Sequence, residues 1–154
     1  MVKARRCDWC GEDPLYVDYH DREWGAPVKD PRELFERLML EGMQAGLSWY
    51  TVLRKREHMR SRFFDFDPEA LDTHGEAALP GWLEDPGLIR HRGKLEALIG
   101  NARAALALDQ PLPELLWQFV AHAPKQNRWR SLAQVPSSTP ASEAMSRELK
   151  RAGF

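Results

Sequence analysis

The sequence has few of the features that mark specialised protein classes. It contains only two cysteines and no internal repeat. No apolar run approaches the length of about 20 residues that a transmembrane helix needs. A disulfide-stabilised scaffold and a membrane span are therefore not expected. The first residues turn polar where a signal peptide needs an apolar stretch, so we expect a cytoplasmic protein that acts at the nucleoid. With 154 residues, the chain predicts one domain over 1–154.

Charge is balanced overall but grouped locally. The formal net charge is −1, which argues against indiscriminate binding to nucleic acid. Basic residues nevertheless gather in "RKREHMRSR" at 54–62, "RHRGK" at 90–94 and "RELKR" at 147–151. Each run is explained equally well by a solvated helix face, so the charge pattern permits binding to DNA without requiring it.

Apolar residues recur at spacings of three and four, and no stretch alternates convincingly, which predicts an all-α fold. Asp30 followed by Pro31 is a typical helix start, and Ser48 after Gly46 can cap a new helix that carries Trp49. Further helices are expected at 68–84, 93–108, 112–122 and 140–151.

Glu41 stands out because Leu34, Leu38, Trp49 and Val52 lie on nearly the same helical face. A carboxylate on a core face must either pair with a cation or line a pocket, since an unpaired buried charge costs several kcal/mol. A flat cationic ligand such as an alkylated purine suits a carboxylate beside aromatic rings. Taken singly, each nearby aromatic residue is more simply a core residue.

The stretch "LEDPGLIRHRGKLEALIGNARAALAL" at 83–108 is two helical patterns around a tight turn. A hairpin before a helix start presents free N–H groups that bind phosphate well beside basic side chains. Gly87 and Gly93 can equally be ordinary turn and cap glycines. Together with a base pocket, the hairpin indicates an enzyme that extrudes a damaged base from DNA.

Four blocks of the sequence resemble successive blocks of the 3-methyladenine DNA glycosylase I family: "CDWCGEDPLYVDYHDREWG", "LFERLMLEGMQAGLSWYTVLRKRE", "DPGLIRHRGKLEALIGNARA" and "SSTPASEAMSRELKRAGF". The resemblance implies a helix-hairpin-helix glycosylase fold, with the N-terminal segment packed on the helical domain. It also implies an enzyme that excises 3-methyladenine from alkylated double-stranded DNA and releases it as the free base, leaving an abasic site. A monomer is the simplest expectation for an enzyme that acts on one flipped nucleotide.

The resemblance also implies a set of base-binding residues. Glu41 matches the base-recognising carboxylate, Trp49 the stacking residue, and Tyr19 another pocket aromatic, with the remaining aromatic wall formed by Trp9, Tyr16 and Trp24. The family lacks the catalytic aspartate of most helix-hairpin-helix glycosylases, and the segment after Lys94 offers no substitute. A base methylated at N3 is cationic, so it leaves without further protonation.

Contacts to DNA are expected from two segments. Gln44, Gly46 and Leu47 are expected to enter the gap left by the flipped nucleotide. Backbone contacts are expected around the hairpin, from Gly87, Arg90, His91, Arg92, Gly93 and Lys94. Lys94 is alternatively an ordinary exposed lysine.

A structural zinc is a further implication of the resemblance, with Cys7 and His20 as two of its ligands and Cys10 not required. The other two ligands belong to a C-terminal segment that we expect to be missing from these 154 residues. Two other readings remain: a non-catalytic helix-hairpin-helix DNA-binding module, and a small zinc-dependent interaction protein. The pair Glu41 and Trp49 argues against the first, and the shortage of Cys and His ligands against the second.

Overall fold

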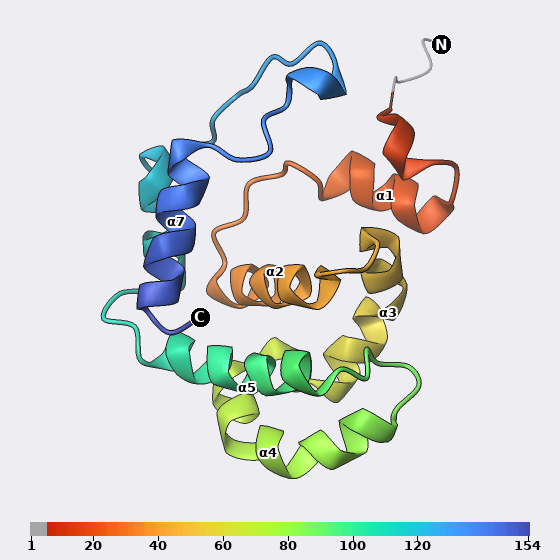
Figure 1. The fold of residues 1–154 in the computed structure, drawn as a ribbon, viewed down its shortest axis with the longest axis vertical. Coiled ribbons are helices and arrows are strands. Elements are labelled where there is room, and N and C mark those ends of the chain that lie inside the picture. Colours follow the sequence, from red (N-terminus) through yellow and green to blue (C-terminus); the bar gives the residue numbers. More distant parts are fainter. Residues whose placement is uncertain (1–5) are drawn as a thin grey trace.

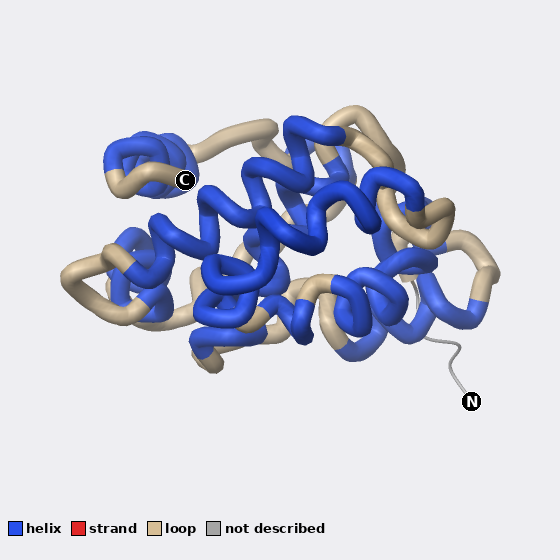
Figure 2. The backbone as a smooth tube through the Cα atoms, turned by 90° about the horizontal axis from the view of Figure 1, so that it is seen from below, coloured by secondary structure: helices blue, strands red, loops and turns tan. Residues whose placement is uncertain are grey.

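The computed structural model describes residues 6–154, which form helices joined by loops and contain no strand (Figure 2). The all-α prediction is confirmed. In chain order, the elements are η1 (Asp8–Cys10), α1 (Pro14–Arg22), α2 (Pro31–Gln44), α3 (Trp49–Arg62), η2 (Phe64–Phe66), α4 (Pro68–Glu84), α5 (Arg92–Leu106), α6 (Leu112–Trp117), η3 (Gln118–Val120), η4 (Leu132–Gln134) and α7 (Pro140–Arg151).

Three helices begin with the same pair of residues, an aspartate followed by proline. Asp13, Asp30 and Asp67 each accept a hydrogen bond from a backbone N–H in the first turn of α1, α2 and α4. Proline at the first helical position needs no hydrogen-bond acceptor and has its φ already set for a helix. Helix α1 was not expected from the apolar pattern, although its start carries this signal.

The expected helix bounds agree with the structure to within a few residues. Helices α4 and α7 have the predicted bounds, α5 ends two residues early at Leu106, and the 112–122 segment divides into α6 and η3. The predicted break after α2 is confirmed: Gly46 has φ +78°, a conformation that favours glycine, and Ser48 caps α3 by accepting from the Thr51 N–H.

The core lies among α2, α3, α4 and α5, and it corrects the predicted face of α2. Its deepest side chains on α2 are Phe35, Met39, Leu40 and Met43, whereas Leu34 and Leu38 of the predicted stripe are only half-buried. Because the helix ends at Gln44, the apolar period does not continue into α3. Glu41 is therefore solvent-accessible at the margin of the core.

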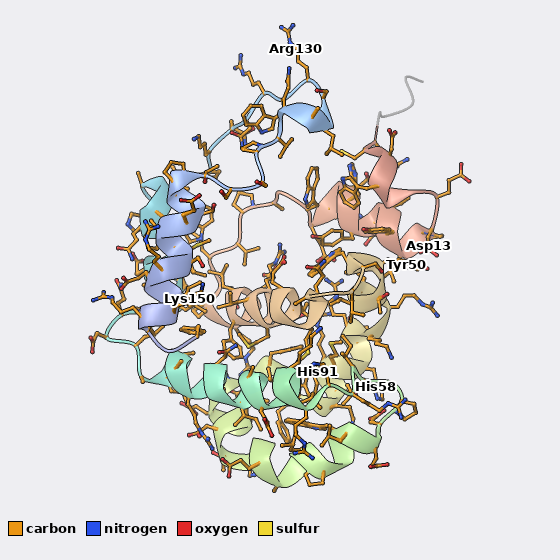
Figure 3. The ribbon with its side chains drawn as sticks, viewed as in Figure 1. Asp13, Tyr50, His58, His91, Arg130 and Lys150 are labelled. Carbon is orange, nitrogen blue, oxygen red and sulfur yellow. The ribbon has the colours of Figure 1, made fainter. Side chains whose placement is uncertain are left out.

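Helices α4 and α5 run antiparallel and pack extensively on one another, with the 85–91 hairpin joining them (Figure 1). At the opposite side of α2, the η1–α1 segment packs against the start of α3. There the Tyr50 hydroxyl donates to Asp13 over 2.7 Å (Figure 3). No described helix is both long and apolar enough to cross a membrane.

Candidate active site

An aromatic cavity of about 260 Å³ opens where η1 and α1 meet the end of α2 and the start of α3. Its lining contains all six residues predicted to bind a base, together with one predicted DNA contact: Trp9, Tyr16, Tyr19, Trp24, Glu41, Gln44 and Trp49. A larger cavity, about 400 Å³, lies between the ends of α2, α4 and α5, but Phe35 is its one aromatic residue. We place the candidate site in the aromatic cavity, since a planar ligand needs ring faces to stack on.

The aromatic rings of the cavity support one another. The Trp9 ring centroid lies 5.1 Å from that of Tyr16 and 5.2 Å from that of Trp24. Across the cavity, Tyr19 lies 5.6 Å from Trp49, which belongs to α3. These separations are typical of stabilising aromatic pairs, so α1 and α3 together hold the ring faces in place.

Glu41 lines this cavity from the last turns of α2 and has no cation to balance it. Partial burial raises the pKa of its carboxyl, and no cation of the described residues offsets that rise. The pKa of the Tyr19 hydroxyl is also raised, first by burial and second by the charge of Glu41. The indole N–H of Trp49 is buried without a partner among the described residues. The site is thus suited to a ligand that is flat, cationic and able to donate hydrogen bonds.

A layer of ion pairs lies directly behind the aromatic cavity. Arg56 pairs with Glu23 at 2.7 Å, and Arg60 pairs with the buried Glu36 at 2.7 Å. These groups line a small cavity of about 70 Å³ that also touches Glu41. Both arginines belong to the basic run at 54–62, so this part of the run forms ion pairs with α2 and with the loop that carries Glu23. The run itself was the only sequence signal of this layer.

The loop between α2 and α3 is short and internally bonded. Gln44 Nε2 donates to the carbonyl of Leu47 over 2.9 Å, and the Leu47 N–H donates to the carbonyl of Gln44 over 2.7 Å. Leu47 is 37% exposed at the tip of this loop. An apolar side chain is thereby presented beside the cavity on a turn made possible by Gly46.

Side chains of α3 bind the 85–91 hairpin. Lys55 Nζ donates to the carbonyls of Pro86 and Leu88, and His58 Nε2 lies 2.9 Å from a carboxylate oxygen of Asp85. A Cβ at Gly87 would lie 2.4 Å from the His58 ring, so a larger residue here would displace that ring. These contacts fasten the hairpin to α3.

The side chains of the hairpin that were predicted to contact DNA differ in exposure and in their hydrogen bonds within the protein. Arg90 and Arg92 are exposed, whereas His91 caps α5 through Nδ1, which accepts from the Lys94 N–H (Figure 3). Lys94 Nζ donates to two carbonyls at the end of α2. Lys94 is half-buried, which corrects the alternative of an ordinary exposed lysine. The first turn of α5 still leaves the N–H groups of Arg92 and Gly93 without intrahelical acceptors.

Cys7 and His20 lie together, but they do not complete a metal site. The Cys7 N–H donates to His20 Nε2 over 3.3 Å, and His20 Nδ1 lies 2.9 Å from Asp21. Cys10 is a free, buried thiol. Within residues 6–154 there is no group of three or more His, Cys, Asp or Glu placed to hold a metal ion. Zinc needs four ligands, so these residues alone do not fit it, and zinc binding stays a prediction.

Known proteins resemble the chain over nearly its whole length. A family model described as methyladenine glycosylase matches residues 9–154. DNA-3-methyladenine glycosylase 1 of Escherichia coli (strain K12) is 49% identical over 152 residues, covering 97% of this chain and 81% of that protein. A crystal structure of 3-methyladenine DNA glycosylase I has a TM-score of 0.94 at 48% identity, covering 97% of this chain and 84% of that chain. For 3-methyladenine DNA glycosylase I from Staphylococcus aureus, in work on its recognition of 3-methyladenine, the TM-score is 0.91 at 33% identity, covering 97% and 81%.

Proposed function

The chain belongs to the methyladenine glycosylase family, and from this premise we infer that it is a DNA-3-methyladenine glycosylase, which excises 3-methyladenine from alkylated DNA in base-excision repair. The observation in the structure that supports this most strongly is the unpaired Glu41 among the aromatic rings of the cavity. A module that binds only the DNA backbone gives no reason for such a cavity.

We propose that Glu41 accepts hydrogen bonds from the N–H groups of the extruded base, while Trp49 and Tyr19 contact its faces. The base is cationic, so both the carboxylate and the ring faces attract it more strongly than a neutral base. Trp9, Tyr16 and Trp24 complete the wall and exclude water. Desolvation of Glu41, seen in its raised pKa, strengthens its interaction with the cation.

The reaction needs little acid catalysis from the protein. The bond between C1′ of the deoxyribose and N9 of the base breaks, and its electron pair neutralises the departing cation. Water adds to C1′ and loses a proton, which leaves an abasic site. The protein contributes by holding the base away from the stack and by orienting it, and these effects lower the barrier without a proton donor.

We further propose that the α4–hairpin–α5 unit is a helix-hairpin-helix element that binds the phosphates of double-stranded DNA. Arg90 and Arg92, with the free N–H groups at the start of α5, supply the contacts. Leu47 then enters the gap left by the extruded nucleotide, with Gln44 and Gly46 shaping its turn. A monomer, working in the cytoplasm at the nucleoid, suffices for one flipped base.

Release of methylated bases from methylated DNA tests the function, with the products identified chromatographically. The wild-type protein is expected to release 3-methyladenine selectively. Glu41→Gln is expected to lower the rate about a hundredfold, the effect of losing one oriented charged partner. Glu84→Gln, at an exposed position on α4, is the matched control and should match the wild type. A wild-type protein that binds DNA but releases no base would instead indicate a non-catalytic DNA-binding module.

A further inference from the structure

The ammonium of Lys94 is bonded to the end of helix α2, forty-nine or more residues earlier in the chain. Nζ donates to the carbonyl of Met43 over 2.8 Å and to the carbonyl of Ala45 over 2.6 Å. These carbonyls are at the C-terminal end of α2, where the helix dipole is negative and the last carbonyls have no intrahelical donors. A lysine is well suited to this position.

The same contact joins the two segments that we expect to meet DNA. Lys94 lies in the first turn of α5, directly after the hairpin, whereas Ala45 opens the loop that carries Gly46 and Leu47. The stem of Lys94 lines a cavity of about 160 Å³ between α2 and α5. Two of the three ammonium protons are used within the protein, so this side chain is directed toward the loop and away from the outer surface of the hairpin.

We propose that Lys94 is a positioning residue: its ammonium fixes the 45–48 loop to the hairpin, so that docking of the hairpin on DNA places Leu47 beside the target nucleotide. This proposal rests on the proposed function for the target it serves. It replaces the role of phosphate ligand that the basic run at 90–94 predicts for Lys94. Glu41 and Trp49 are held by their own helices, so their positions in the base cavity do not depend on this contact.

Substitution of Lys94 by Met removes the ammonium and keeps most of the stem. Lys55→Met is the matched control, because Lys55 also donates to two backbone carbonyls but holds the hairpin and not the loop. Arg90→Ala supplies the reference for a lost phosphate contact. Lys94→Gln, which retains N–H donors, serves if Lys94→Met does not fold.

The first measurement is hydrogen exchange without DNA, followed at the amide of Leu47, which donates to the Gln44 carbonyl. We expect faster exchange in Lys94→Met and wild-type exchange in Lys55→Met. Unchanged exchange at Leu47 in Lys94→Met would overturn the proposal. Because this measurement requires no glycosylase activity, it decides the role of Lys94 even if the wild-type protein releases no base, a result that would contradict the proposed function alone.

The second measurement compares binding and excision on methylated DNA. Lys94→Met is expected to excise between about tenfold and about a hundredfold more slowly, since misplacement by ~1 Å near a reacting group has effects of that size. Its affinity for free 3-methyladenine and the salt dependence of its DNA binding should match the wild type. If the slope of log affinity against log salt concentration instead falls by about 0.9, as expected for Arg90→Ala, Lys94 is a phosphate ligand and the proposal is wrong.

Discussion

Two glutamates on helix α2 show how differently neighbouring regions of this protein treat a carboxylate. Glu36 is only 9% exposed and faces the ion-pair layer, where the Arg60 guanidinium donates to it over 2.8 Å. Glu41 faces the aromatic cavity, is more accessible to solvent, and has no cation to lower its raised pKa. The more buried carboxylate, Glu36, has a cationic partner, whereas the more exposed one, Glu41, has none.

The difference separates a carboxylate that is paired within the fold from one that is left free to bind a ligand. A buried carboxylate with an arginine partner contributes to the fold mainly because removing one partner leaves the other unsatisfied. A carboxylate in an open cavity without a partner contributes little to the fold and awaits a ligand. Substitutions at the two glutamates should therefore have opposite effects on stability and activity.

The largest expected effect on stability is at the paired carboxylate. Glu36→Gln removes the buried carboxylate that pairs with Arg60 and leaves only the exposed Glu57 to balance it; we expect a loss of about 3 kcal/mol in the free energy of unfolding, the lower end of the range for broken buried pairs because Arg60 is one-third exposed. Thermal unfolding should show a Tm lower by about 6–12 °C.

Glu41→Gln is the internal comparison. The folded-state pKa of Glu41 is raised, so its ionised form disfavours the fold above that pKa, and the glutamine should unfold at the same or a higher temperature.

The largest expected effect on ligand affinity in the cavity is at Trp49. Trp49→Ala should lower the affinity for free 3-methyladenine by about 2 kcal/mol, or roughly thirtyfold, because base stacking on an aromatic side chain has that magnitude. Trp129 is 49% exposed on the loop between η3 and η4 and does not line the cavity, so Trp129→Ala is a control for loss of a tryptophan. Quenching of the remaining tryptophan fluorescence measures both. Equal losses in the two variants would contradict the assigned cavity.

The pH dependence of excision sharpens the comparison between paired and unpaired carboxylates. Glu23 has its pKa lowered, first by the hydrogen bond from Arg56, so it stays ionised as pH falls. Glu41 has its pKa raised by burial, so it takes up a proton first and stops attracting a cationic base. Excision should therefore fall about tenfold per pH unit below a midpoint above the ordinary value of 4.5. A pH–rate profile of Glu41→Gln should lack this limb.

The smallest expected effect concerns the arginines of the two regions. Arg90 is exposed at the hairpin, so Arg90→Ala should reduce the salt slope of DNA binding by about 0.9, the contribution of one phosphate contact. Arg56 is half-buried and paired with Glu23, so Arg56→Ala should lower the melting temperature and leave the salt slope unchanged. Binding titrations at several salt concentrations distinguish the two, and a reduced slope for Arg56→Ala would contradict its internal role.

The local signals of the sequence predicted much of the fold. An aspartate before proline begins α1, α2 and α4, and the start of α2 was predicted from it, whereas Asp85 before Pro86 lies in the hairpin turn. The same signal at Asp13 was missed, because the aromatic-rich segment that follows has no clear apolar stripe. The aromatic residues of the cavity were predicted by resemblance, and their meeting in one cavity depends on α1 packing against α3.

The sequence by itself determined where helices begin and end, because caps, prolines and glycines act through bonds within a few residues of each other. Tertiary structure alone decided which charges face solvent and which are paired within the protein. Arg56, Arg60 and Lys94 lie in basic runs that look alike along the chain, yet each has a partner in another segment, 24 to 51 residues away. An ion pair or a lysine on a distant carbonyl depends on which helices pack together, and packing follows the whole core and not the local pattern.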